Sequence, residues 1–251
     1  MLKEEVEKYR APALDKGLDI LELLARSSES LSQSEICKAL GRSPNEIYRM
    51  LDRLVRRNYV RRIVGDRYEI TLKLFELAHQ TPPIARLVSQ ALPIMREFAL
   101  KSKQACHLVI QDRNMLVVVA QVDGPGYWNV SIRVGSQIEL TNTGSGHIFL
   151  AFASEQERQL MLKQQEKGKP TSLSKELESR LKLVREQGYE MMPSVQVVGV
   201  SNLSAPVFGP LGSVIAAIAC AFTQRLGLAD APDIDAVCLM LREAAAELTQ
   251  R

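Results

Sequence analysis

Arginine side chains are concentrated in one short part of the sequence. Residues 42–67 contain eight arginines and no lysine, against three acidic residues, although the whole chain of 251 residues has a net charge of only +3. Guanidinium groups bind phosphate oxygens and guanine edges through a planar fork of N–H donors. Because charge clusters are usually solvated surface, this one indicates nucleic-acid binding only if a suitable scaffold carries it.

The rest of the sequence offers little catalytic chemistry. No G-x-S-x-G, H-E-x-x-H or Walker A motif occurs. Cys106 and His107 could form a metal site or a nucleophile pair with the distant His147, but neighbouring residues on a strand point to opposite faces. We therefore expect no catalytic residue, no metal site and no cofactor, and a protein that is not an enzyme.

The composition is that of an ordinary globular protein, with 46% hydrophobic and 24% charged residues. The longest apolar stretch, residues 214–222, is far shorter than the roughly 20 residues of a membrane-spanning helix. The first ten residues contain no apolar segment typical of a secretory signal, and the four cysteines are far apart with no C-x-x-C. We expect a reduced, cytoplasmic protein that does not bind membranes.

Two helix-start signals lie close together before and within the arginine cluster. Ser32-Gln33-Ser34-Glu35 and Ser43-Pro44-Asn45-Glu46 each place a serine and a glutamate at capping-box spacing. Gly41, between them, is typical of a helix end, and proline suits the first position of a helix. An amphipathic pattern over about residues 13–27 predicts a helix before both. A short helix, a tight turn and a second helix at this spacing predict a helix-turn-helix.

The second of these helices would have two different faces. Apolar residues form one stripe, while Asn45, Arg49 and Arg53 lie on the other side, with Tyr48 at the border. The major groove of DNA accepts such a helix, with its N-terminal residues at base edges and its flanks at phosphates. The alternative is an exposed helix stabilised by the pairs Glu46–Arg49 and Asp52–Arg56. We favour DNA because the following segment also fits it.

The following segment reads as a β-hairpin. Residues 59–64 and 67–70 are rich in strand-forming residues, and Gly65-Asp66 between them predicts a type II′ turn. A hairpin directly after a recognition helix is a wing, and Arg61 and Arg67 would lie near the DNA backbone. The sequence therefore predicts a winged helix-turn-helix. The expected DNA contacts are Ser43, Pro44, Asn45, Tyr48, Arg49, Arg53, Arg61 and Arg67.

Residues 11–248 resemble the IclR family of bacterial transcription regulators. In the first part the similarity is carried by APALDKGLDILELL, LSQSEICKALGRSPNEIYRMLDRLVRRNYVRR and YEITLKLFELA. Further along it is carried by IRVGSQIELTNTGSGHIFLAF and GYEMMPSVQVVGVSNLSAPVFGPLGSVIAAIACAF. These stretches follow the order and spacing of the family.

The resemblance implies an α+β protein in three parts. These would be a winged-helix DNA-binding domain over residues 1–80, a linker helix over 81–102, and a GAF-like effector-binding domain with an antiparallel sheet over 103–251. Members of the family are typically homodimers or homotetramers. They repress or activate catabolic operons by binding a double-stranded DNA operator, under the control of a small-molecule effector.

The second half, taken by itself, also predicts an α+β domain. A helical stripe follows Thr81-Pro82-Pro83 to about residue 102, and Pro93 should kink it or end its first part. Strands are expected over 106–111, 115–122, around 130–134, 203–208 and 214–222. Helices are expected from about residue 143, and over 155–165, 173–187 and 233–248.

The glycine-rich stretch 141–147 opens one of these helices. Backbone N–H groups at a helix start can hold an anion, although an ordinary glycine-rich connection is the alternative. Polar residues at the start of an apolar strand and two aromatic residues on a loop favour a pocket. We expect a small organic acid, aromatic acids included, with its carboxylate at this helix start. The expected effector contacts are Tyr127, Trp128, Gly144, Ser145, Gly146, His147, Asn202, Ser204, Ala219 and Ala221.

Some of these positions depart from the residues usual in the family. His147 follows Gly146 where the family usually has lysine, and Asn202 and Ser204 stand where cysteine and alanine are common. Ala219 and Ala221 match two serines that help to hold small oxoacids in some members. A pocket without those hydroxyls is poorly suited to a very small anion.

The sequence therefore predicts a sequence-specific transcription factor controlled by an effector. Effector binding would shift the placement of the two domains through the linker helix, because a ligand changes an equilibrium only by differential affinity for its states. One alternative is a small-molecule enzyme with a non-functional winged helix, which the missing catalytic residues disfavour. Another is a protein-binding adaptor, which the arginine-rich helix face disfavours.

Overall fold

The computed structural model describes residues 11–79, 82–113, 115–165, 173–225 and 231–249. The first ten residues and the predicted domain boundary at 80–81 lie outside this part of the chain. The chain divides into two compact units, one ending at Pro82 and one beginning at Pro83. Within the described residues, no helix is both long and apolar enough to cross a membrane.

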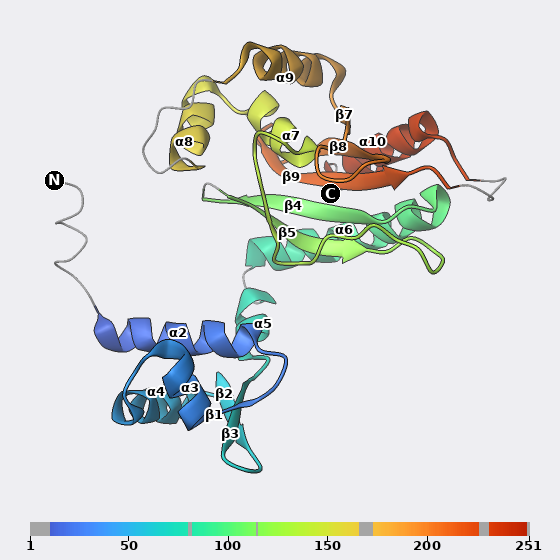
Figure 1. The fold of residues 1–251 in the computed structure, drawn as a ribbon. Coiled ribbons are helices and arrows are strands. Elements are labelled where there is room, and N and C mark those ends of the chain that lie inside the picture. Colours follow the sequence, from blue (N-terminus) through green and yellow to red (C-terminus); the bar gives the residue numbers. More distant parts are fainter. Residues whose placement is uncertain (1–10, 80–81, 114, 166–172, 226–230, 250–251) are drawn as a thin grey trace. The chain divides into compact units, whose positions relative to one another are not determined.

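The first unit is a helix-turn-helix with a β-hairpin, as the sequence predicts (Figure 1). Its elements are α2 (Pro12–Arg26), β1 (Leu31–Ser32), α3 (Gln33–Leu40), α4 (Pro44–Arg56), β2 (Val60–Ile63), β3 (Arg67–Ile70) and α5 (Lys73–His79). The strands pair in the order β1-β3-β2. The fully buried Ile20, Ile36 and Ile47 bring the three helices α2, α3 and α4 into one core. This packing fixes the inner face of α4 and leaves its outer face to solvent.

The hairpin turn differs from the predicted type II′ turn. Ile63 pairs with Arg67, so the loop contains three residues, 64–66. Both Gly65 (φ +80°) and Asp66 (φ +55°) are left-handed, whereas a type II′ turn needs a positive φ only at its first central position. Aspartate adopts this conformation more readily than most residues, because its short polar side chain can bond locally. The hairpin was correctly predicted, but its turn type was wrong.

The second unit is built on an antiparallel sheet. Its strands are β4 (Cys106–Asp112), β5 (Met115–Val122), β6 (Gln137–Ile138), β7 (Glu190–Pro193), β8 (Val200–Phe208) and β9 (Val214–Thr223). Among the described residues they lie in the order β6-β5-β4-β9-β8-β7. The predicted strand around 130–134 is wrong, because the chain turns at Gly135 (φ +86°) and only Gln137–Ile138 pair with β5. The strand β7 was not predicted.

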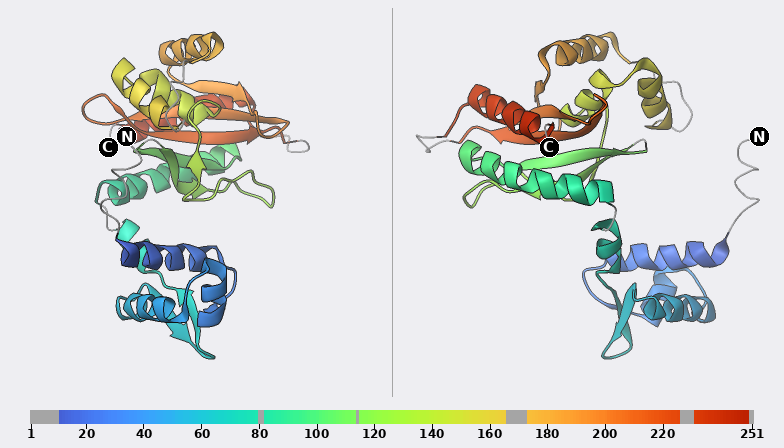
Figure 2. Two further views of the ribbon diagram at one scale, coloured as in Figure 1. Left: turned by 60° about the vertical axis from the view of Figure 1, so that its left-hand side comes forward. Right: turned by 180° about the vertical axis from the view of Figure 1, so that it is seen from behind.

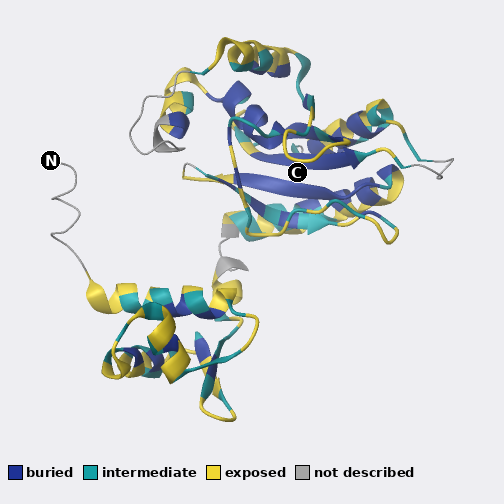
Figure 3. Ribbon diagram, in the orientation of Figure 1, coloured by how far each residue is buried: buried dark blue, intermediate teal, exposed yellow. Residues whose placement is uncertain are grey.

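Two layers of helices cover the two faces of this sheet (Figures 1 and 2). α6 (Pro82–Ser102) and α10 (Ile234–Thr249) share one core with the sheet, in which Met95 and Leu241 are buried. α7 (Gly144–Phe152), α8 (Glu155–Gln165) and α9 (Lys175–Gln187) cover the opposite face. α6 does not end at Pro93, and its inner residues belong to the core of the second unit rather than to a free linker. Figure 3 shows that α7 is the most deeply buried helix of its layer.

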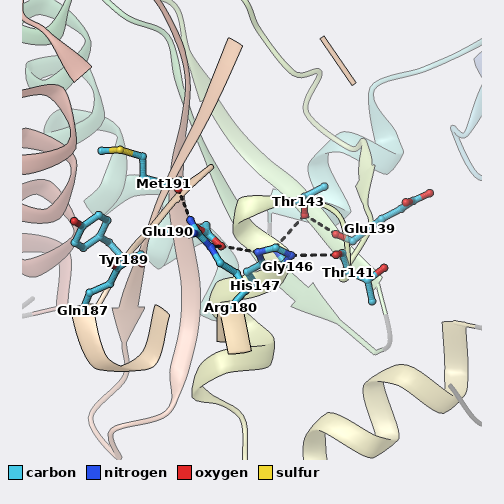
Figure 4. Close-up of polar contacts among 10 residues, drawn as sticks. All are labelled: Glu139, Thr141, Thr143, Gly146, His147, Arg180, Gln187, Tyr189, Glu190 and Met191. Carbon is cyan, nitrogen blue, oxygen red and sulfur yellow. Dashed lines mark hydrogen bonds and ion pairs between the residues drawn. The ribbon is translucent and has the colours of Figure 1, made fainter. Parts of the chain in front are cut away.

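A buried carboxylate joins this second helical layer to the sheet (Figure 4). Glu190, at the start of β7, is fully buried, and its Oε2 lies 2.6 Å from Nδ1 of His147 on α7. Arg180 of α9 donates from Nε to both oxygens of the same carboxylate, at 3.0 and 3.1 Å, and also bonds the Met191 carbonyl. Nε2 of His147 lies 3.0 Å from the carbonyl oxygen of Thr141. Both ring nitrogens of His147 therefore lie within hydrogen-bond distance of an oxygen atom, which holds the ring between β7 and the segment before α7.

The pKa of Glu190 is lowered from its usual value of 4.5. Burial by itself raises this pKa, but the hydrogen bonds from His147 and Arg180 and the charge of Arg180 outweigh it. A pKa that is lower in the folded state stabilises the fold above the unfolded value, and this stabilisation is lost as the pH falls through the folded pKa. Glu190 therefore stabilises the second unit at neutral pH, begins to lose this contribution below about pH 4.5 and has lost it once the pH is below its folded pKa.

We expect Glu190→Gln to lower the free energy of unfolding at pH 7 by about 3 kcal/mol, since it leaves the Arg180 guanidinium without its counter-charge and disturbs the contact with His147. The difference from the parent protein should shrink as the pH falls below about 4.5. Urea denaturation at a series of pH values measures both effects. The matched control is Glu186→Gln on the exposed face of α9, which should change stability by less than about 0.5 kcal/mol. Equal stability of the parent and Glu190→Gln at pH 7 would refute this role.

Candidate DNA-binding surface and effector pocket

The outer face of α4 is exposed from its first residue. Ser43, Pro44 and Asn45 at the start of the helix are exposed, and Tyr48 is 60% exposed. The exposed arginines of the helix and of its C-terminal end are Arg49, Arg53, Arg56 and Arg57. The structure therefore brings the predicted residues of α4 onto one accessible surface.

Glu46 holds the start of α4. Its carboxylate accepts hydrogen bonds from the backbone N–H of Ser43 at 3.2 Å and from the Ser43 hydroxyl at 2.8 Å, and it pairs with Lys16 of α2. The hydrogen bond from Lys16, followed by those from Ser43, lowers the pKa of Glu46 to about 2. This carboxylate is therefore ionised and bound within the unit. Of the two ion pairs that a merely exposed helix would use, Glu46–Arg49 is not formed and Asp52–Arg56 is formed.

Most of the clustered arginines are paired within the first unit. The ion pairs are Arg42–Asp19, Arg56–Asp52, Arg61–Glu69, Arg62–Asp66 and Arg67–Glu35. In the part of the chain that the structure describes, the guanidinium groups of Arg49, Arg53 and Arg57 have no ion-pair or hydrogen-bond partner. Arg49 and Arg53 are four residues apart, so they share one face of α4 with Asn45. Arg57 was not among the predicted contacts.

Arg67, which the sequence assigns to phosphates, is engaged inside the wing. It is half-buried, and its Nε donates to the carbonyl oxygen and the hydroxyl of Ser30 at 3.0 and 3.1 Å. It also pairs with Glu35 at 3.2 Å. These contacts tie β3 to the segment before β1, so Arg67 serves the fold of the wing. Arg61 is exposed but lies against Glu69.

The start of α7 lies directly on the sheet. A Cβ at Gly146 would collide with the carbonyl oxygen of Leu140, and a Cβ at Gly144 would lie only 2.7 Å from the Ser204 hydroxyl oxygen. Gly146 is therefore required by close packing against the backbone, and a side chain at position 144 would displace the Ser204 hydroxyl. Figure 4 shows Thr143 beside this first turn, with its hydroxyl accepting from the N–H of Gly146 at 3.1 Å.

The first-turn N–H groups that precede Gly146 are those of Gly144 and Ser145. Such groups have no acceptor within their own helix, and they attract negative charge. Both residues line a pocket of about 290 Å³ between α7 and the sheet. Asn202 and Ser204 of β8 and Ala219 of β9, three of the residues expected to contact an effector, line the same pocket.

One row of residues crosses the floor of this pocket. In the strand register His107 of β4 pairs with Ala219, Ala219 pairs with Ser204, and Ser204 pairs with Glu190. Paired residues in antiparallel strands share a face, and neighbouring strands lie about 4.8 Å apart, so His107 and Ser204 are about 10 Å apart. Ala219, which lies between them, has only a methyl group as its side chain. The space above this methyl group is the hollow of the pocket.

His107 was not predicted as an effector contact, although its position on β4 places it in the pocket. It is 7% exposed, and burial lowers its pKa to about 4, so the ring is neutral at pH 7. Its ring nitrogens have no hydrogen-bond partner among the described residues. The hydroxyls of Ser145 and Ser204, both nine-tenths or more buried, likewise have no partner in the described part of the chain. The pocket therefore contains polar groups that the protein itself does not satisfy.

Several predicted effector residues lie elsewhere. Tyr127, which is 98% exposed, and Trp128 line a separate hollow with Lys103 and Arg225. The His147 side chain does not line the pocket, because its ring is held between the Glu190 carboxylate and the Thr141 carbonyl, and Gly146 and Ala221 do not line it either.

Comparison with known proteins identifies both units. Residues 13–63 match the IclR helix-turn-helix domain, and residues 83–250 match the bacterial transcriptional regulator IclR C-terminal family. The chain is 29% identical over 212 residues to the HTH-type transcriptional regulator KdgR of Dickeya chrysanthemi, and the aligned part covers 82% of this chain and 69% of KdgR.

Solved structures share the fold. The crystal structure of Thermotoga maritima IclR has a TM-score of 0.77 at 22% identity, covering 96% of this chain and 98% of that one. An IclR homologue from Microbacterium hydrocarbonoxydans, complexed with 4-hydroxybenzoate, has a TM-score of 0.77 at 20% identity, covering 95% and 98%. The family match to the second unit alone spans more than half of the chain. The chain therefore belongs to the IclR family, and it is a DNA-binding transcriptional regulator with an effector-binding domain rather than an enzyme.

Proposed function

We propose that this regulator places α4 in the major groove of a pseudo-palindromic operator. The observation that carries the proposal is the guanidinium groups of Arg49 and Arg53, which have no partner among the described residues and share a helix face with Asn45. Arginine and asparagine are the side chains that most often read guanine and adenine edges. An exposed helix that served only the fold would use its arginines in ion pairs, as Arg56 does with Asp52.

The position of each residue along α4 suggests its contact. Ser43, Pro44 and Asn45 lie in the N-terminal turn, and Tyr48 and Arg49 follow on the exposed face, so these residues would meet base edges or the adjoining backbone. Arg53 and Arg57 lie further along and would meet phosphates. Arg61 in the wing would contact a phosphate after exchanging its pairing with Glu69.

We infer that two copies bind one operator, as a homodimer or as part of a homotetramer. A single helix-turn-helix reads one half-site, and dimers read two half-sites about one helical turn apart. Leu14 and Leu18 are 61% and 47% exposed and lie one turn apart on α2, which supports a contact between copies through the first unit. A protein with this role acts on DNA in the cytoplasm.

The pocket supports a small organic acid as the effector. The N–H groups at the start of α7 and the hydroxyls of Ser145 and Ser204 suit a carboxylate. A volume of about 290 Å³ is small for a ligand site, so it suits a compact molecule. The structural relative that holds 4-hydroxybenzoate is consistent with an acid of this size, aromatic acids included.

Effector binding would control the operator through differential affinity. The acid alters DNA binding only if it binds the DNA-competent and DNA-incompetent conformations with different affinities. By the same linkage, DNA must alter the affinity for the acid by an equal factor. A regulator that responds to an organic acid suits an operon whose enzymes break that acid down.

Replacing Arg49 with alanine is expected to weaken specific DNA binding by about 1–3 kcal/mol and to relax the sequence preference, because a base contact is lost. Arg53→Ala should weaken binding to all duplexes alike and lower the slope of log K against log salt by about 1, since a phosphate contact is lost. Salt titrations with duplexes selected by the parent protein from a randomised pool measure both effects. Arg26→Ala, on the exposed end of α2, is the control and should bind like the parent. Parent-like binding by both α4 variants would rule out this docking.

Replacing Ala219 with leucine is expected to fill the hollow in the pocket floor and to abolish binding of organic acids. DNA binding in the absence of acid should stay within a few-fold of the parent, because the first unit is untouched. Calorimetric titration with a panel of acids and gel shifts with the selected duplexes measure the two activities. Ile215→Leu, on the same strand outside the pocket, is the control. Undiminished acid binding by Ala219→Leu would exclude this pocket.

A further inference from the structure

We propose that His107 is a specificity-determining residue of the effector pocket, whose ring bonds a hydroxyl or carbonyl oxygen of the effector on the side opposite its carboxylate. This inference rests on the proposed effector site and adds a second point of recognition to it. The effector class becomes a monocarboxylic acid that carries a second, uncharged oxygen.

The pairing of the strands determines where the two groups that would recognise the effector lie. His107 and Ser204 flank Ala219 in one row, and Gly144 at the start of α7 lies against the Ser204 hydroxyl. The two flanking strand positions are about 10 Å apart at the backbone, and the side chains project over the hollow from both sides. A ligand lying on Ala219 with one end at α7 therefore directs its other end toward the imidazole.

The imidazole is a recognition group that the fold leaves unused. His107 is 7% exposed, and its ring nitrogens have no hydrogen-bond partner in the described residues. Among the described residues, the buried side-chain polar atom without a partner is Oδ1 of Asn142, so the ring nitrogens of His107 are open to the pocket, whereas the ring of His147 is used inside the fold. Burial lowers the pKa of His107 to about 4, so the neutral ring offers one donor and one acceptor. Such a ring suits a hydroxyl or a carbonyl oxygen.

The charges around the pocket argue against a second carboxylate. Among the described residues that line it there is no lysine or arginine, and Glu139 at the rim is the single charged side chain. One carboxylate can be met by the helix start and the serine hydroxyls, but a second would lie near a neutral ring and an acidic residue. The site therefore favours an acid whose second oxygen is uncharged.

Matched pairs of acids that differ by one oxygen test this inference. Suitable pairs are 4-hydroxybenzoate and benzoate, 4-hydroxybutanoate and butanoate, and levulinate and pentanoate. We expect the parent protein to bind the oxygenated member of at least one pair tenfold or more tightly in calorimetric titrations, because the other member leaves the ring unpaired. Equal affinities within every pair would overturn the proposal for His107 while leaving the acid site intact. Failure of every acid to bind would instead overturn the proposed effector class and this inference with it.

Substitutions at His107 separate recognition from packing. His107→Phe keeps an aromatic ring but removes both polar atoms, so the preference for the oxygenated acid should fall to within about twofold, while the affinity for the other member is kept. His107→Asn and His107→Gln each return a polar atom near one ring nitrogen, and one of them should restore part of the preference. Thermal melting of each variant shows whether it folds. A preference ratio in folded His107→Phe equal to that of the parent would refute the role.

Discussion

The effector domain depends on one buried carboxylate. Glu190 has no exposed surface, and it accepts hydrogen bonds from His147 of α7 and Arg180 of α9 while forming part of β7. Because α7 and α9 share this partner, the helical layer is fixed on the sheet at the point where α7 begins. Glu190 also ends the row that continues through Ser204 and Ala219 to His107. The strand pairing that places Glu190 against His147 and Arg180 therefore also forms the floor of the pocket.

Features that short stretches of sequence determine were predictable. The capping box at Ser32 and the proline after Ser43 set the starts of α3 and α4, because helix starts depend on residues within one turn. The apolar runs of β5 and β9 were likewise visible as strands. The glycine-rich start of α7 was predicted as an anion site, and Gly144 and Ser145 do line a pocket. The sequence did not show why glycines stand there. The structure shows that Gly146 lies close to Leu140 and that Gly144 lies close to Ser204.

Features set by distant partners were not predictable. No local signal indicates that Arg67 bonds Ser30 or that His147 meets Glu190, since these pairs are joined only by the fold. β7 has only four residues and begins with a glutamate and ends with a proline, so it lacks the long apolar run that revealed its neighbours. His107 was first weighed as a metal ligand, and its place in the pocket follows from pairing with Ala219, a residue more than a hundred positions away. Tyr127 and Trp128 had the chemistry of pocket residues but lie in another hollow.

The number of arginines in the cluster overstates how many guanidinium groups are free to bind DNA. Five of the eight guanidinium groups are paired within the described residues, which leaves three, on Arg49, Arg53 and Arg57. Arg53 and Arg57 are the two of these that we assign to phosphates, and since each neutralised phosphate contributes about −0.9 to the slope of log K against log salt, they give about −2 and a weak electrostatic hold. In the proposed dimer, two linked copies would double these contacts and bind as one ligand, so the affinity would depend strongly on how the copies are joined. An effector that changes the arrangement of the two copies can therefore release the operator without altering any side chain of α4.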